Sequence, residues 1–85
     1  MERALAEEIN LLAIEFGMKL SRSLGKVQAD CPPEEAHEVT RHVGIVLAAL
    51  LQHIHDPIYF EHPELKPKQL GGTYEVPDFQ GVQPR

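Results

Sequence analysis

The chain has 85 residues, of which 42% are hydrophobic and 25% are charged, and its formal net charge is -5 at pH 7. A chain of this length forms one small domain, whose core is close to the minimum needed for independent stability. The acidic charge argues against binding to nucleic-acid phosphates, which depends on clustered lysine and arginine. We therefore expect a single domain that gains stability from a partner or a second copy and binds no nucleic acid.

The sequence shows no signal for export or membrane insertion. Its start, MERALAEEIN, is charged and lacks the basic residues and apolar run of a signal peptide. No stretch approaches the roughly 20 apolar residues that span a bilayer. The single cysteine, Cys31, cannot form an internal disulfide, which fits a reducing compartment. We expect a cytoplasmic protein with no membrane segment.

The first predicted element is a helix over residues 2–24. Large apolar residues recur there at steps of three and four and form one stripe: Leu5, Ile9, Leu12, Phe16 and Leu20. Acidic residues near the start and basic residues near the end complement the helix dipole, and Gly25 is the expected stop.

Two further sets of residues in this helix fall outside the stripe. Small residues beside it would let another helix approach closely: Ala6, Ala13 and Gly17. Larger ones make the apolar surface wider than a two-helix seam requires: Leu11, Ile14 and Met18. We expect this second set to bind a partner protein.

A second helix is predicted over residues 32–55. The segment DCPPEE carries start signals, because proline is tolerated in a first turn and Glu34 and Glu35 favour the positive helix end. Apolar residues again recur at steps of three and four: Ala36, Val39, Val43, Val46 or Leu47, Leu50 and Ile54. A loop of about six residues would join the two helices as an antiparallel hairpin, which makes residues 1–55 a helical domain.

Residues 43–51, VGIVLAALL, are apolar on every face of this helix. A two-helix hairpin cannot bury all of them, and an exposed patch of this kind favours association. We expect an all-α homodimer in which two hairpins form a four-helix bundle. The expected interface residues are Val43, Val46, Leu47, Leu50 and Leu51. The alternative is that the C-terminal segment folds back over this run.

Residues 56–85 differ in composition and are expected to form an extended arm. Asp56 precedes a proline, which disfavours helical geometry and should end the second helix. Five of the seven prolines, three of the six glycines and four of the five aromatic residues lie in this segment. Aromatic residues are unusual in disordered tails, so the arm should pack on something. TYEV could form a short edge strand.

The segment HIHDPIYFEHPE gathers three of the five histidines beside acidic residues. Two histidines that are two residues apart on a helix point about 200° away from each other, so His53 and His55 cannot share a metal ion there. We interpret them as residues of a last helical turn, where they can bond free carbonyls. The alternative is a metal site completed by His62 and a carboxylate. We expect no bound metal and no cofactor.

No catalytic motif is complete. HEVTRH, residues 37–42, resembles the zinc-protease pattern H-E-x-x-H, but Arg41 stands where the second histidine is needed. Cys31 at a helix start could be a nucleophile, yet the sequence offers neither a base nor an oxyanion site for it. We expect a protein that is not an enzyme.

The two predicted helices, ERALAEEINLLAIEFGMKLSRSL and PPEEAHEVTRHVGIVLAALLQHI, resemble in overall plan the small helical antiactivators that sequester LuxR-type quorum-sensing regulators. The resemblance implies a regulatory protein that inhibits a transcription factor through its helical body. The alternative is an antitoxin or phage-type enzyme inhibitor that binds through its arm, with Tyr59, Phe60, Tyr74 and Phe79 as the main contacts. The further alternative is a small metal-binding protein built on the histidines.

Overall fold

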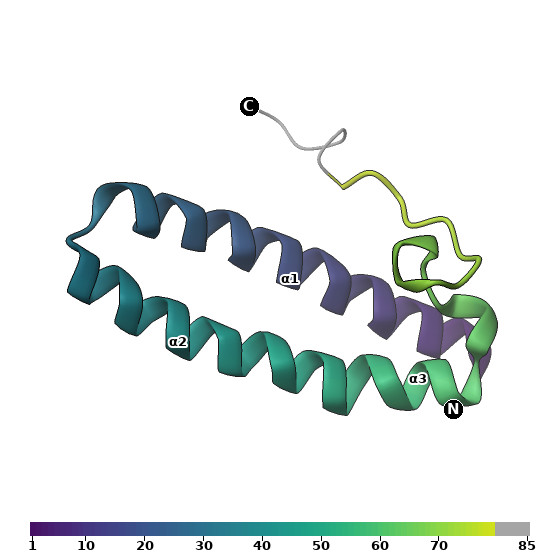
Figure 1. Cartoon of the computed structure of the whole chain (residues 1–85). Coiled ribbons are helices and arrows are strands. Elements are labelled where there is room, and N and C mark those ends of the chain that lie inside the picture. Colours follow the sequence, from purple (N-terminus) through teal and green to yellow (C-terminus); the bar gives the residue numbers. More distant parts are fainter. Residues whose placement is uncertain (80–85) are drawn as a thin grey trace.

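The computed structural model describes residues 1–79, and in this part of the chain all regular elements are helical (Figure 1). Helix α1 (Arg3–Asp30) and helix α2 (Pro33–Leu50) pack as an antiparallel hairpin. The second arm continues through a π-helical turn, η1 (Leu51–His55), into α3 (Asp56–Glu61). Two 3-10 turns follow, η2 (Pro63–Leu65) and η3 (Lys68–Leu70). The predicted all-α hairpin is confirmed, whereas its dimerisation into a four-helix bundle remains a prediction.

The predicted end of the first helix at residue 24 is wrong, because α1 runs through Gly25 to Asp30. A single exposed glycine costs a helix only about 1 kcal/mol. Beyond it, Val27 is half-buried and the Gln28 amide donates a hydrogen bond of 3.1 Å to the Thr40 hydroxyl. Extended backbone at Cys31, which precedes a proline, ends the helix. The connection is therefore much shorter than the expected six residues.

The predicted end of the second helix at Asp56–Pro57 is also wrong, because helical structure continues to Glu61. In a regular α-helix the proline ring would clash with the carbonyl four residues earlier. Here the Asp56 N–H donates to the Leu51 carbonyl, five residues back, and this wider π turn precedes the proline. Pro57 then stands in the first turn of α3, where its missing N–H costs little. The division of the chain at residue 55 into a hairpin and an arm remains a prediction.

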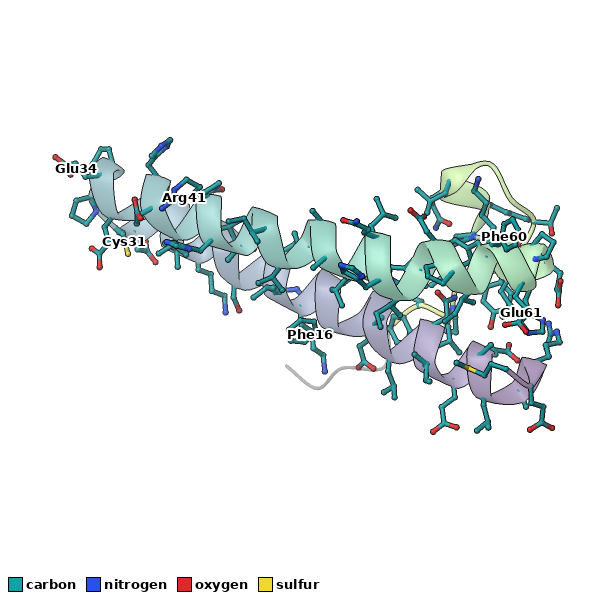
Figure 2. All side chains as sticks on the ribbon, turned by 90° about the horizontal axis from the view of Figure 1, so that it is seen from below. Phe16, Cys31, Glu34, Arg41, Phe60 and Glu61 are labelled. Carbon is teal, nitrogen blue, oxygen red and sulfur yellow. The ribbon has the colours of Figure 1, made fainter. Side chains whose placement is uncertain are left out.

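The face of α1 that is buried consists of small residues, not of the large apolar stripe. Ala6, Asn10 and Ala13 are its buried residues. Gly17 continues this row, and a Cβ there would stand 3.7 Å from Leu47 and 3.9 Å from Leu50. The large apolar residues remain exposed, with exposed fractions of 52% for Leu5, 38% for Ile9, 60% for Leu12 and 51% for Phe16. Phe16 points away from α2 (Figure 2). The small residues therefore lie on the buried face of α1, with Gly17 opposite Leu47 and Leu50 of α2.

The C-terminal segment folds back onto the base of the hairpin. Leu65 and Ala6 are fully buried and form a cluster with Ile58, against which Tyr74 packs. Gly71 has a φ of 91°, which favours glycine, and a Cβ on Gly72 would stand 2.0 Å from the Lys66 carbonyl oxygen. The predicted TYEV strand is reduced to one bridge between Tyr74 and Pro67. These contacts fix the segment after α3.

The alternative that this segment covers residues 43–51 does not match the position of its described part, which ends at Phe79. That part lies along α1 near the N-terminal end of that helix (Figure 1). On the other helical arm Ile45, Val46 and Leu51 remain exposed. Within residues 1–79 the apolar run of α2 is therefore only partly covered.

Candidate functional site

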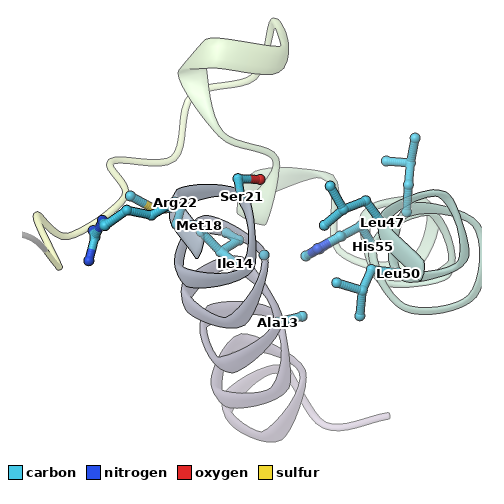
Figure 3. Close-up of a pocket in the computed structure, with 10 residues that line it drawn as sticks. Ala13, Ile14, Met18, Ser21, Arg22, Leu47, Leu50 and His55 are labelled. Carbon is cyan, nitrogen blue, oxygen red and sulfur yellow. The ribbon is translucent and has the colours of Figure 1, made fainter. Parts of the chain in front are cut away.

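A groove of about 620 Å³ lies between α1 and α2 (Figure 3). Leu47, Leu50 and His55 point across it toward α1. The α1 side of the groove combines small residues with larger ones. The remaining lining residues are Ala13, Ile14, Gly17, Met18, Ser21, Arg22 and Leu51.

A smaller cavity of about 260 Å³ adjoins this groove beneath the C-terminal segment. The two share Ile14, Met18 and His55. The other walls of the smaller cavity are Tyr59, Pro67, Gln69, Leu70 and Val76. Together they form one continuous, mostly apolar surface, which we call the Met18 groove. Its polar lining residues are Ser21, Arg22, His55, Tyr59 and Gln69.

A polar cluster lies where the two cavities meet. Asn10 is fully buried in the seam, and its Oδ1 accepts hydrogen bonds of 2.8 Å from His55 Nδ1 and 2.8 Å from the Tyr59 hydroxyl. The rings of His55 and Tyr59 stack with centroids 5.7 Å apart. The Asn10 Nδ2 is buried without a hydrogen-bond partner in the described part of the chain. Because a buried amide needs partners, this cluster fixes how α1 meets the π turn.

Burial shifts the titration of both ring partners. It lowers the pKa of His55, and the nearby Asp56 carboxylate opposes this shift more weakly. It raises the pKa of Tyr59, although the hydrogen bond to Asn10 acts in the opposite direction. Both side chains are therefore neutral near pH 7. The cluster can donate and accept hydrogen bonds there, but it offers no charge.

The structure brings together some of the residues predicted to bind partners. Ile14 and Met18, predicted as partner contacts, line the same groove as three residues predicted for the dimer interface: Leu47, Leu50 and Leu51. Leu11 and Val43 are half-buried and Val46 is exposed, and none of the three lines this groove. The roles of all these residues remain predictions.

The aromatic residues of the predicted arm are held in different ways. The Tyr74 hydroxyl donates a hydrogen bond of 2.6 Å to Glu7, which raises the pKa of Tyr74. Tyr59 bonds to Asn10, and Phe79 is half-buried. Phe60 is 92% exposed.

Sequence reasoning did not predict the polar cluster of Asn10, His55 and Tyr59. The available signals were that Asn10 stands in the row of small residues and that His55 and Tyr59 lie one helical turn apart.

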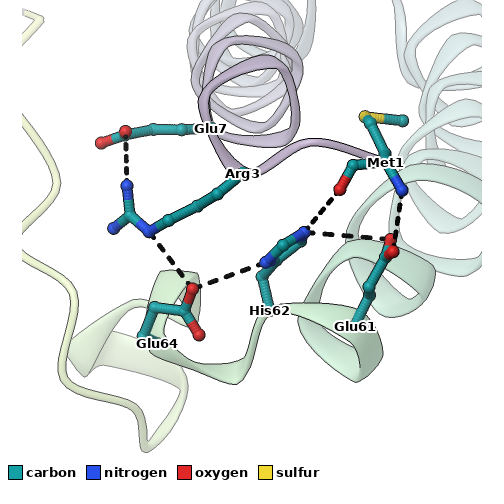
Figure 4. A network of polar contacts seen from close by, with 6 residues as sticks. All are labelled: Met1, Arg3, Glu7, Glu61, His62 and Glu64. Carbon is teal, nitrogen blue, oxygen red and sulfur yellow. Dashed lines mark hydrogen bonds and ion pairs between the residues drawn. The ribbon is translucent and has the colours of Figure 1, made fainter.

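The three histidines of HIHDPIYFEHPE do not meet. His53 is exposed, and His55 lies in the Met18 groove. His62 donates a 2.9 Å hydrogen bond to the Met1 carbonyl and faces Glu61 and Glu64 (Figure 4). In residues 1–79 no three histidine, cysteine or carboxylate side chains lie close enough to hold one metal ion.

The network around His62 joins the start of α1 to the end of α3. The terminal ammonium of Met1 pairs with Glu61 at 2.7 Å, and Arg3 bonds to Glu64 at 3.2 Å and to Glu7 at 3.1 Å (Figure 4). The Met1 ammonium lowers the pKa of Glu61. These groups are largely exposed, and exposed ion pairs contribute little to stability. The network therefore positions the ends of the two helical arms without forming a reactive centre.

The other catalytic candidates, HEVTRH and Cys31, lie apart from the Met18 groove. Glu38 receives hydrogen bonds from Arg41 at 2.7 Å and pairs with His42 at 3.2 Å, and all three side chains are exposed. Arg41 and His42 lower the pKa of Glu38. HEVTRH therefore forms part of a solvated helix face. Cys31 is a free, half-buried thiol in the turn between the helices.

The continuous helical arm Pro33–Glu61 has the length and composition of a membrane-crossing helix. It has 29 residues, and its most apolar window reaches a mean hydropathy of 1.3. One such helix is a weak indication, because a core helix of a soluble protein passes the same test.

No family model matches the chain, and no curated protein and no solved structure matches it either.

Proposed function

We propose that this chain is a small non-enzymatic regulatory protein of the cytoplasm that binds and sequesters another protein through the Met18 groove. The observation that carries the proposal is an open apolar groove between two helices. Apolar grooves of this kind accept the apolar face of a helix from a partner. The partner class rests on the resemblance to antiactivators, which implies a transcriptional regulator.

The chemistry of the groove supports binding rather than catalysis. Its walls are aliphatic, and its central polar groups, His55 and Tyr59, are both engaged with the buried Asn10. Met18, which lines both cavities, is adaptable in contact with varied apolar shapes.

The arm-based inhibitor is supported less well. Tyr59 and Tyr74 already donate their hydroxyl protons to Asn10 and Glu7 within the chain. Binding through these rings would break both hydrogen bonds before any contact with a target forms. Phe60 stays available to a target, but a single ring carries little of an interface. The helical body is therefore our proposed contact surface.

The test compares what the full chain and its variants retain from a lysate of the source cells. Met18→Asp and Ile14→Asp place a charge in the groove, and each should weaken binding of the captured protein at least tenfold, which corresponds to about 1.4 kcal/mol. Phe60→Asp is the matched control, because it adds the same charge at a 92% exposed position outside the groove.

Circular dichroism of each variant must show an unchanged helix content. Normal binding by Met18→Asp and Ile14→Asp, with loss of binding in the double variant Tyr74→Ala and Phe79→Ala, would replace the groove with the arm. Binding that resists all of these changes would contradict both versions of the proposal.

A further inference from the structure

The large apolar stripe of α1 has no partner within the described chain. Leu5, Ile9, Leu12 and Phe16 are each more than one third exposed. The C-terminal segment packs on another side of the helix, since Met18 lies about 200° around the axis from Phe16 and lines the cavity beneath that segment. The stripe is thus a surface separate from the Met18 groove.

The spacing of the stripe is that of a coiled-coil seam. Residues 5, 9, 12, 16 and 19 alternate steps of four and three, which keeps them on one side of α1 facing a partner helix. Glu2, three residues before Leu5, directly precedes the helix. The four central positions are the exposed apolar residues. The two outer positions are charged, with Glu2 at the start and Lys19 at the end. Both are exposed.

This order of side chains complements itself when the seam is reversed. In an antiparallel pair with the matching register, Leu5 faces Phe16 of the second copy and Ile9 faces Leu12. Glu2 then faces Lys19 at both ends of the contact. A parallel pair would instead oppose Glu2 to Glu2 and Lys19 to Lys19, which is unfavourable.

The charges at the ends can form such pairs at little cost. Among residues 1–79, Glu2 takes part in no ion pair, and Lys19 pairs only with Glu15, one helical turn away on its own surface, at 3.1 Å. A pair of that kind contributes about 0.3–0.5 kcal/mol, so exchanging it for an intermolecular pair costs little.

We infer that the exposed stripe of α1 binds the same stripe of a second copy of this chain, antiparallel and around a two-fold axis. A two-fold contact uses the same patch on both copies and closes the assembly at two chains. The contact buries the four large apolar residues of each copy and leaves the Met18 groove of both copies open. The inference is independent of the proposed partner protein, because it concerns a different side of α1.

The first test measures the mass of the full chain in solution by sedimentation equilibrium. Wild type should have twice the chain mass of 9.6 kDa at tens of micromolar. Leu12→Glu should raise the dimer dissociation constant at least tenfold and keep its helix content, because the side chain is 60% exposed in the single chain. Ile45→Glu is the matched control: it is 58% exposed but lies on α2 outside the seam, so it should remain dimeric.

The second test exchanges the charges at the ends of the seam. Glu2→Lys and Lys19→Glu should each weaken the dimer, and the double variant should restore it. Each single substitution has a cost within its own helix, from the dipole at Glu2 and from the pair with Glu15 at Lys19. The double variant keeps both costs, so restored dimerisation reports the intermolecular pairing alone.

A wild-type chain that stays at 9.6 kDa would overturn the inference, as would dimers that survive Leu12→Glu. Dissociation by Ile45→Glu but not by Leu12→Glu would move the contact to α2. If both single charge variants weaken the dimer and the double variant does not restore it, the antiparallel register is excluded. The Met18→Asp variant should still form a dimer, because it should lose only partner binding. Its mass in solution therefore tests the dimer independently of the proposed function of the Met18 groove.

Discussion

Replacing Leu65 with alanine tests whether the segment after α3 is part of the folded domain. Leu65 is fully buried against Ala6 and Ile58, although it stands in a short 3-10 turn between prolines. Leucine-to-alanine changes in a packed core cost about 2–5 kcal/mol, since apolar contact is lost and a cavity remains. Total stability at about 0.05–0.15 kcal/mol per residue is of the order of 4–13 kcal/mol for a chain of this length. The substitution should therefore remove a large fraction of it.

The measurement is thermal and urea unfolding followed by circular dichroism. For a domain of this size each kcal/mol shifts the melting temperature by about 4–8 °C, so Leu65→Ala should lower it by at least about 8 °C. Leu70→Ala is the matched control, because Leu70 lies in the next 3-10 turn and is 52% exposed. Equal melting temperatures for the two variants would mean that the segment does not pack on the hairpin as described.

Four further changes test other parts of the structure. Tyr59→Phe removes one of the hydrogen bonds to the buried Asn10 and should lower the unfolding free energy by about 1 kcal/mol in urea titrations. Burial lowers the pKa of His55 below its ordinary value of 6.5. The stability that the neutral His55 side chain contributes is therefore present above pH 6.5 and is lost as the pH falls through the lowered pKa. His55→Gln should make the unfolding free energy less dependent on pH between about pH 7.5 and 5. Gly72→Ala should displace the loop, because its Cβ would overlap the Lys66 carbonyl, and amide exchange of residues 66–74 should then accelerate, whereas Gly25→Ala, in open space, should not have this effect. A chelator should leave the melting temperature unchanged, since a metal held at 100 times its dissociation constant would add about 2.7 kcal/mol.

Helical periodicity predicted α1 but not its buried face. The exposed stripe occupies positions 5, 9, 12 and 16, and the buried row occupies positions 6, 10, 13 and 17. The two patterns have the same steps and differ by one residue, so periodicity alone cannot choose between them. Hydrophobicity favours the larger side chains, whereas close packing of two helices favours the smaller ones. Only the position of Leu47 and Leu50 opposite Gly17 decides which row faces α2.

The site was predictable only where it depends on residues near one another in sequence. Ile14 and Met18 stand out on α1 as apolar residues off the main stripe, and both line the groove. The acceptor for His55 and Tyr59 is Asn10, which is 45 residues from His55 along the chain, and no local pattern connects them. That contact depends on the length of the second helical arm. Because helical structure continues past Asp56, Tyr59 stays one turn from His55 and reaches the same amide.

The π turn explains why this continuation was not predicted. A proline rule treats Pro57 as a helix end because it assumes the hydrogen-bond spacing of a regular α-helix. The hydrogen bond from the Asp56 N–H to the Leu51 carbonyl has a five-residue spacing, so the rule does not apply here. The residue types of LQHIH do not predict this spacing. The cost of the π turn is offset by contacts on both sides of it: His55 bonds to Asn10, and Ile58 enters the cluster with Ala6 and Leu65. Tertiary packing therefore selects a backbone geometry that local sequence rules disfavour, and that geometry places the polar cluster between the two cavities of the Met18 groove.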